Sequence, residues 1–555
     1  MTTHDGHPRG GHRPTVGGPR VALREHFHQA AWDEPLIVTL GRPGRRGVLP
    51  PDAGAEIRGI VGDVTADVPA ALRRREPPDL PELSQSEVVR HYTRLSQMVL
   101  ANNVAVNLGL GTTTMKYNPL VNEALTRSPK LAELHPGQDD STIQGILEIL
   151  YRFGRILAEI SGMARFTFQP AGGTQGILAN ALMIRAYHDS RGEAAQRDEI
   201  ITTIFSHPAN AAAPATIGFK VITLYPGPQG YPALDALKRA VGERTAGLMI
   251  TNPEDTGIFN PQIADFVRVV HEAGGLCAYD QANANGILGV TRARDAGFDL
   301  CQFNLHKTFS VPHGCMGGAV GASGVREDLV PFLPAPTVEF DGSRYYLDDQ
   351  RPASVGAVRS PLGNIHSVVK SYAWVMALGA EGLREVAHMA VLNNNYLARK
   401  VTAIRGASLS FAHENSSRRL EQARYSWEEL AAETGVHTTD VHNRMIDFGV
   451  QGYFTSHHPW LVPEPFTLEP AETYSQEELD EFAAVLERVA GEAYSDPELV
   501  KRAPHRSTAA SPLPGAEKRP AMTWRAFLAM GADERGAPGD APGADDSGRD
   551  AQDGS

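Results

Sequence analysis

The stretch Asn304-Leu305-His306-Lys307-Thr308-Phe309 joins a strand-like run to a glycine-rich loop, and Lys307 stands at its centre. The apolar run before it, from Phe298 to Phe303, has the length and composition of a buried strand. The loop after it, from His313 to Gly318, is rich in glycine. A second strand-like run further upstream ends on Asp280. The sequence therefore predicts that a lysine and an aspartate stand at the ends of two neighbouring buried strands.

A lysine and an aspartate placed in this way suit a site for pyridoxal phosphate. The lysine amine can form a Schiff base with this cofactor, and the aspartate can pair with its pyridine nitrogen. Most lysines are instead solvated surface charges, and many aspartates at strand ends only cap turns. Spacing alone therefore leaves both interpretations of Lys307 and Asp280 open.

The region from Glu199 to Asn304 alternates strand-like and helix-like segments. The expected strands are Ile200 to Ile204, Lys220 to Leu224, Gly247 to Thr251, Leu276 to Tyr279 and Phe298 to Phe303, and the expected helices are Leu234 to Val241 and Ile263 to Ala273. Such alternation predicts crossover connections and a mainly parallel sheet. Because ligands bind these sheets at the carboxyl ends of the strands, we expect His207, Asp280 and Lys307 to meet at one edge.

Two further segments have the composition of ligand-binding loops. The first, from Gln169 to Gly176, precedes a helical run and contains Gly172, Gly173 and Thr174. Small residues at a helix start let backbone N–H groups approach a phosphate, and the helix dipole favours its charge. A tight turn without a ligand would look similar, so both interpretations stay open.

The second segment, from Gly109 to Pro119, is dense in glycine and hydroxyl residues and includes Thr112, Thr113 and Thr114. Hydroxyls and free backbone N–H groups suit contacts with an anion or a carboxylate. A purely structural turn is an equal alternative.

The composition is that of a globular protein of 555 residues, enough for two or three domains. The net charge of −13 argues against a nucleic-acid-binding surface, which needs clustered Lys and Arg. We find no run of about 18 apolar residues and no apolar segment of a secretory signal in residues 1–20. Cys277, Cys301 and Cys315 are too few for a disulfide framework, and the histidines of the leader reflect composition rather than a metal site. We therefore predict a cytoplasmic protein.

The organisation expected along the chain begins with a disordered leader. The expected parts are a leader at 1–33, an N-terminal extension at 34–83, a large α/β domain at 84–364, a smaller C-terminal α+β domain at 365–525 and a disordered acidic tail at 526–555. Apolar residues at three- and four-residue spacing predict a long buried helix from Ile143 to Ile160, and further helices from Ile365 to Met376 and from Leu383 to Val401. The tail cannot bury enough apolar surface to order itself.

The motifs taken together resemble the P-protein of the glycine cleavage system, specifically the pyridoxal-phosphate-bearing second subunit of its two-subunit bacterial form. The resemblance runs from about Glu34 to about Trp524. It is carried by Val88 to Met98, Thr114 to Pro119, His271 to Gly275, Asn304 to Phe309, Pro312 to Gly314 and Pro331 to Pro334. The implied fold is the type I pyridoxal-phosphate-dependent transferase fold, with a mainly parallel central sheet and a smaller C-terminal domain.

The resemblance also implies roles for individual residues. Lys307 would carry the cofactor, Asp280 would keep its pyridine nitrogen protonated, and His207 would lie over its ring. The other implied cofactor contacts are Gly172, Gly173, Thr174, Asn283, His306 and Thr308. The implied substrate contacts are Thr112, Thr113, Thr114 and Asn210.

In this family glycine loses its carboxylate as CO2, and the remaining aminomethyl group passes to the lipoyl arm of a carrier, the H-protein. The second subunit works with a first subunit of the same ancestry, so the resemblance implies both partners and an oligomer. A catalytically silent subunit is a third kind of function to weigh. Lys307 and Asp280 argue against it, since the silent subunit lacks the lysine.

Departures from the family pattern gather at the site. Thr112 and Thr113 stand where the family has Ser and Cys, Gln175 where it has His, and Gln281 where it has Gly. Cys315 and Met316 occupy positions of a glycine loop. This pattern suits a paralogue that decarboxylates or condenses another amino acid in specialised metabolism, or it is harmless drift.

Overall fold

The computed structural model describes residues 21, 23–25, 27, 30, 32, 34–76, 80–100, 108, 117–312, 318–453, 455, 456 and 458–505. Among them, residues 108–503 and 21–25 belong to one compact unit, and residues 27–100, 504 and 505 belong to another. No helix within these ranges combines the length and the apolar composition needed to cross a membrane. The domain boundaries expected from the sequence remain our proposal.

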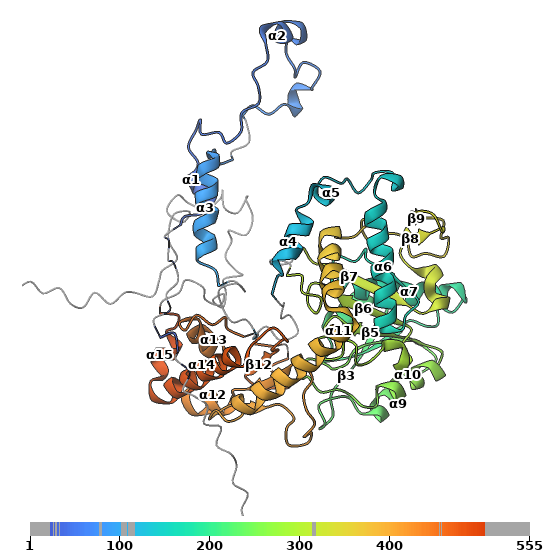
Figure 1. Ribbon diagram of the computed structural model, residues 1–555, viewed down its shortest axis with the longest axis vertical. Helices are drawn as coiled ribbons and strands as arrows, with labels where there is room; N and C mark the ends of the chain where they lie inside the picture. The colour runs from blue at the N-terminus through green and yellow to red at the C-terminus, as the bar shows by residue number, and fades with distance from the viewer. Residues whose placement is uncertain are drawn as a thin grey trace, which may run out of the picture. The chain divides into compact units, whose positions relative to one another are not determined.

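A seven-stranded sheet organises the first unit, with strand order β1-β7-β6-β5-β4-β2-β3 (Figure 1). Its strands are β1 (Arg165–Thr167), β2 (Glu199–Thr203), β3 (Lys220–Leu224), β4 (Thr245–Thr251), β5 (Leu276–Gln281), β6 (Leu300–Asn304) and β7 (Gly321–Val325). The neighbours from β3 to β6 pair in parallel, whereas β7 pairs antiparallel with both β6 and β1. The mainly parallel sheet predicted from the sequence is confirmed, and the antiparallel edge is new.

Helices cover both faces of this sheet, and alternation along each strand decides which side chains they meet. Helices α7 (Gly173–Ser190) and α8 (Ala209–Thr216) cover one face, and α6 (Gln144–Ser161), α9 (Leu234–Ala240), α10 (Ile263–Glu272) and the first part of α11 (Ile365–Val401) cover the other. In β5, Leu276 and Ala278 pack toward α7, whereas Cys277 and Tyr279 pack toward α10. By the two-residue period of a strand, Asp280 therefore faces α7 and α8.

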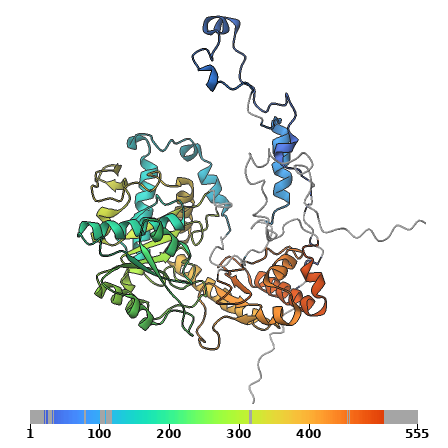
Figure 2. The same ribbon diagram turned by 180° about the vertical axis from the view of Figure 1, so that it is seen from behind.

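The C-terminal part of the first unit has its own small sheet and core. Its strands are β10 (Ser408–Leu409), β11 (Ala423–Ser426) and β12 (Pro465–Leu468), all antiparallel, and its helices are α12 (Glu428–Thr434), α13 (Thr438–Ile446), α14 (Gln476–Ser495) and α15 (Pro497–Lys501). Both views show this part, in orange and red, beside the sheet-bearing part (Figures 1 and 2). Helix α11 connects the two and is kinked at Gly379, whose φ is 67°. The two helices expected from the sequence, from Ile365 to Met376 and from Leu383 to Val401, are confirmed as the two segments of α11 on either side of the non-helical Gly379.

The remaining short elements are divided between the two units. The first unit also has α4 (Leu120–Thr126), α5 (Pro129–Ala132), η3 (Asp140–Thr142), η4 (Ala293–Ala296), η5 (Glu327–Phe332) and the hairpin β8 (Thr337–Phe340) with β9 (Tyr345–Asp348). The second unit has α1 (Ile37–Leu40), α2 (Ala55–Val61), η1 (Ala70–Leu72) and α3 (Gln85–Gln97). Within the second unit, the Glu34 carboxylate accepts hydrogen bonds from His91 at 2.8 Å and Arg94 at 3.0 Å. These bonds hold the pKa of Glu34 below its usual value.

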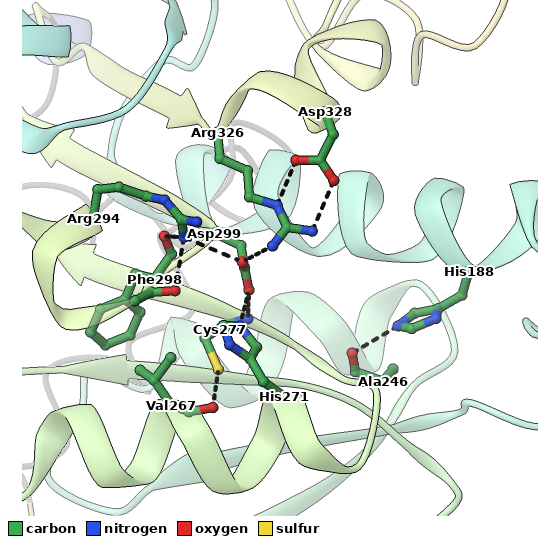
Figure 3. A network of polar contacts seen from close by, with 11 residues as sticks. His188, Ala246, Val267, His271, Cys277, Arg294, Phe298, Asp299, Arg326 and Asp328 are labelled. Atoms are coloured by element: carbon green, nitrogen blue, oxygen red, sulfur yellow. Dashed lines mark hydrogen bonds and ion pairs between the residues drawn. The ribbon is translucent and has the colours of Figure 1, made fainter.

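A polar network around Asp299 ties the amino end of β6 to its neighbours (Figure 3). One oxygen of Asp299 accepts from the Cys277 N–H at 2.7 Å and lies 2.8 Å from His271 Nε2, and the other accepts from Arg326 at 2.5 Å. His271, Cys277 and Asp299 have the atom types of a metal site. However, Arg326 and Arg294 already balance the Asp299 charge, and burial raises the pKa of the Cys277 thiol well above its usual value. We therefore assign this cluster to the support of the fold.

Candidate active site

The carboxyl ends of three strands bring together the residues that the sequence singled out. Asp280 lies near the end of β5, Lys307 follows β6, and His207 stands between β2 and α8. Asp280 is 3% exposed and Lys307 is 8% exposed, whereas His207 is an exposed residue. Charge interactions link His207 to both of the other residues. One edge of the sheet therefore carries a lysine, an aspartate and a histidine within electrostatic reach of one another.

Four donors hold the carboxylate of Asp280. Its Oδ2 accepts from the Asn210 amide at 2.7 Å and from the Thr251 hydroxyl at 3.4 Å. Its Oδ1 accepts from the Gln302 amide and from the Ala282 backbone N–H. Thr251 and Gln302 are the direct ladder partners of Asp280 on β4 and β6. Neighbouring strands of the sheet thus fix the buried Asp280 carboxylate in one position. A fixed carboxylate is suited to pair with a protonated ring nitrogen.

Burial is the main influence on the Lys307 amine. It lowers the pKa of Lys307 from its usual value, against the opposing charges of Glu469 and Asp280. An amine must be neutral to attack a carbonyl carbon, and a lysine removed from water reaches that form more readily. Lys307 is therefore suited to act as a nucleophile.

His207 is oriented by the start of α8. The Ala209 N–H donates to His207 Nδ1 at 3.1 Å. The surrounding protein lowers the pKa of His207 by desolvation, and the Lys307 charge adds to this effect, while Asp280 opposes it. A neutral, oriented ring is the form that stacks on another flat ring without a charge penalty.

Helix α7 offers a start suited to an anion. Its first residue is Gly173, and the preceding Gly172 supplies no side-chain cap. A Cβ on Gly173 would lie 2.7 Å from Asn304 Oδ1, so the absence of a side chain lets the backbone approach the strand end. Thr174 lies in the same first turn. The free N–H groups and the helix dipole together favour a phosphate at this point.

The other predicted site residues each have a hydrogen-bond partner in the structure. Asn283 donates its side-chain N–H to Glu469 at 2.6 Å, and the Thr308 hydroxyl accepts from the Ala284 N–H at 2.9 Å. His306 contacts the Val320 carbonyl through Nδ1 at 3.0 Å. Asn210 is held near Asp280 rather than facing away from it. The structure therefore gathers Asn210, Asn283 and Thr308 around the Lys307–Asp280 pair.

Some positions named from the sequence lie outside the described residues. These are Thr112, Thr113, Thr114, Cys315 and Met316. Gln175 is described, and it bonds to the Ala171 N–H and the Val358 carbonyl, so it fastens the loop before α7.

Sequence reasoning missed three residues of the site. Gln302 could have been noticed, because it interrupts an apolar strand. Thr251 ends an expected strand and carries no distinctive signal. Glu469 lies far along the chain, and only the tertiary structure brings it to Lys307.

These groups fit pyridoxal phosphate. The site offers a buried amine, a carboxylate fixed on the neighbouring strand and an uncapped helix start, which correspond to the aldehyde, the ring nitrogen and the phosphate of the cofactor. The arrangement can hold a cofactor that withdraws electrons from a bound amine.

Comparisons with known proteins agree with this arrangement. The family model described as "Aminotransferase class-V" matches residues 171–387, and the one described as "Glycine dehydrogenase, C-terminal domain" matches residues 386–505. The probable glycine dehydrogenase (decarboxylating) subunit 2 of Pyrococcus abyssi is 45% identical over 508 residues, covering 90% of this chain and 98% of that protein. The protein of the same name from Caldanaerobacter subterraneus subsp. tengcongensis is 41% identical over 478 residues, covering 85% of this chain and 94% of that protein.

Solved structures share the fold. A glycine decarboxylase (P-protein) of the glycine cleavage system, in inhibitor-bound form, aligns with a TM-score of 0.66 and 20% identity, covering 80% of this chain and 100% of that one. The cysteine desulfurase CsdA from Escherichia coli aligns with a TM-score of 0.54 and 15% identity, covering 71% of this chain and 97% of that one. At these identities the likeness concerns the fold alone.

Proposed function

Because the chain belongs to the family of glycine dehydrogenase (decarboxylating) subunit 2, we propose that it removes the carboxylate of glycine with the help of pyridoxal phosphate. The aminomethyl group that remains is transferred to the lipoyl arm of a carrier protein. The observation that carries this proposal is the buried Lys307 amine beside the fixed carboxylate of Asp280. When bound, the cofactor supplies an electron sink for the electron pair left behind by CO2.

The family implies dependence on pyridoxal phosphate, and we propose which residues hold it. Lys307 would bind the aldehyde carbon, Asp280 would keep a proton on the ring nitrogen, and His207 would lie over the ring. The start of α7 would hold the phosphate. The residues proposed to complete the cofactor site are Gly172, Gly173, Thr174, Asn283, His306 and Thr308.

The substrate contacts are proposed from the resemblance together with the geometry. Thr112, Thr113 and Thr114 offer hydroxyls for the glycine carboxylate. Asn210 donates a hydrogen bond to Asp280 in the structure. This bond supports a role for Asn210 in fixing the Asp280 carboxylate rather than in contacting the substrate.

Two partners belong to the proposed reaction. They are a first subunit of the same ancestry and a lipoylated carrier, the H-protein. The word "subunit" in the names of the relatives supports the first of these. Exposed apolar side chains in the second unit, at Ile60, Val64 and Leu72, support a partner that covers them. Location in the cytoplasm stays a prediction.

Labelled CO2 provides the test. The full chain loaded with pyridoxal phosphate is given carboxyl-labelled glycine, alone and together with a first subunit and a lipoylated carrier. Release that requires both partners would support glycine cleavage. No release in any combination, from a chain that retains its bound cofactor, would overturn it.

One observation favours a second candidate, a decarboxylase or carbon–carbon bond-forming enzyme for another amino acid. Gln281 stands next to Asp280, and its buried Oε1 has no hydrogen-bond partner among the described residues. Such an acceptor suits a substrate with a donor beyond the two carbons of glycine. A panel of amino acids, monitored by the absorbance of the bound cofactor, would identify such a substrate.

A further inference from the structure

Glu469 is a buried carboxylic acid that the proposed reaction has not yet used. It directly follows β12 in the C-terminal part, and its side chain is fully buried. Its Oε1 accepts from Asn283 at 2.6 Å and from Asn285 at 2.7 Å, both in the loop after β5. Its backbone N–H donates to the Leu108 carbonyl at 2.9 Å. Contacts from distant parts of the chain therefore fix this side chain in one place.

The second carboxyl oxygen of Glu469, Oε2, differs from Oε1 in its hydrogen bonding. Among the described residues, Oε2 has no hydrogen-bond partner although it is buried. A buried oxygen without a partner costs free energy, so its presence calls for an explanation, and a catalytic role is one. Two amide donors occupy Oε1, so the proton of a neutral Glu469 belongs on Oε2.

The loop that binds Glu469 also reaches the residue next to Lys307, because the Ala284 N–H, between Asn283 and Asn285, donates to the Thr308 hydroxyl at 2.9 Å. Of the two carboxylates that act on the Lys307 amine, Glu469 has a greater effect than Asp280. Asp280 already accepts four hydrogen bonds, so its oxygens are committed to their donors. Of these two carboxylates, only Glu469 has an oxygen without a hydrogen-bond partner among the described residues.

Burial favours the neutral form of both Glu469 and Lys307. It raises the pKa of Glu469 well above its usual value, with a further contribution from the nearby Glu421. It lowers the pKa of Lys307. A neutral amine beside a neutral acid avoids two buried charges, which are expensive to hold in the protein interior.

We propose that Glu469 is the acid–base partner of Lys307, fixed by Asn283 and Asn285 through Oε1 and exchanging the proton through Oε2. One proton moves from the Lys307 ammonium to the Glu469 carboxylate, which leaves a neutral amine and a neutral carboxylic acid. The flexible four-carbon lysine side chain brings the two groups together. The inference rests on the proposed function to the extent that Lys307 is the residue that binds the cofactor.

The test follows the reaction of the cofactor-free full chain with added pyridoxal phosphate. The rate of absorbance change is measured, and borohydride reduction with peptide mass analysis locates the modified lysine. Glu469→Gln keeps the shape and the Oε1 acceptor but cannot take up the proton. We expect it to react about 100-fold more slowly, the usual size of a lost acid–base group. Glu254→Gln removes a buried carboxyl that interacts with Asp255 and Arg424 rather than with Lys307 or Glu469, and it should react at the wild-type rate.

Chemical rescue separates proton exchange from a purely structural role. Glu469→Ala opens space for a small acid, so added formate should restore much of its rate, whereas formate should not change the rate of Glu254→Ala. If Glu469→Gln reacts as fast as the wild-type chain, or if Glu469→Ala is slow and formate has no effect, the inference is overturned. Wild-type chain that is not modified at Lys307 would instead count against the proposed function.

Discussion

Lys307 is subject to opposing influences, because burial favours its neutral amine while two carboxylates favour its ammonium form. Replacing Lys307 with Ala removes the nucleophile without adding bulk. We expect loss of the absorbance that pyridoxal phosphate gains on covalent attachment, and loss of labelled CO2 release to background. Lys238→Ala, which changes an exposed lysine on α9, is the matched control. Persistence of the absorbance in the Lys307 variant would contradict its assignment.

Asp280 is held by donors on both neighbouring strands, so its replacement by Asn preserves the size of the side chain while removing its charge. The cofactor should still bind through Lys307, but its ring nitrogen would lose the partner that keeps it protonated. We expect CO2 release to fall about 100- to 1,000-fold, as when one preorganised electrostatic partner is lost. Activity is measured per bound cofactor. Thr251→Val removes only the longest hydrogen bond to Asp280 and should have a much smaller effect.

Glu254 is a buried carboxyl that affects stability. Burial raises its pKa to about 8, while Thr203 and Arg424 act in the opposite direction. In the unfolded chain this pKa is near 4.5, so the stability that neutral Glu254 contributes is fully present below pH 4.5 and is lost as pH rises through 8.

Replacing Glu254 with Gln should therefore stabilise the protein increasingly between pH 5 and 8, by up to a few kcal/mol. The measurement is the midpoint of thermal unfolding at several pH values, with the wild-type chain alongside. A constant difference between the two proteins over this range would contradict the raised pKa.

The central elements could be predicted because they are made of uniform patterns. Strands β2 to β6 are apolar runs between turns, and α6 has apolar residues at helical spacing. Strand β7 could not be predicted, since Gly321 to Val325 consists of small residues that look like a loop. Tertiary packing explains this composition, because a Cβ on Gly324 would come within 2.3 Å of the Phe166 ring. Small residues in β7 make room for that ring.

The candidate site could be predicted in part for the same reason. Lys307, Asp280 and His207 follow predicted strands of one parallel sheet, so topology places them at one edge. Asn210 and Gln302 hold Asp280 through side-chain geometry that no spacing reveals. Glu469 comes from another part of the fold, and its approach to Lys307 depends on packing between the two parts.

The start of α7 provides a prediction for an element. Gly173→Ala would place a Cβ 2.7 Å from Asn304 Oδ1 and push the helix start away from the strand end. We expect about tenfold weaker binding of pyridoxal phosphate, with the overall fold retained. Gly145→Ala is the matched control, because it also lies in the first turn of a helix and its Cβ would meet nothing within 4 Å. Titration of cofactor-free protein measures both, and equal affinities would contradict the proposed phosphate site.

At the scale of the whole molecule, the second unit has large apolar side chains that are almost fully exposed. Ile60 is 78% exposed and Val64 is 82% exposed. Replacing both with Ser should weaken association with a first subunit at least tenfold, because burial of two apolar side chains is lost. Val290→Ser, in the other unit, is the control. The measurement is co-purification and sedimentation with a first subunit, and unchanged association would show that the partner binds elsewhere.

Helix α11 has a consequence for how this chain can change during evolution. Its segment after Gly379 packs in the core of the large sheet through Val386 and Ala387, and in the C-terminal core through Leu397 and Val401. Each residue of a helix turns the chain by about 100° and advances it by about 1.5 Å. One residue inserted between these two contact sets would therefore rotate everything downstream, and Glu469 would be carried away from Lys307. Residues of this helix can therefore be substituted, but the number of residues between the two contact sets cannot change without moving Glu469 relative to Lys307.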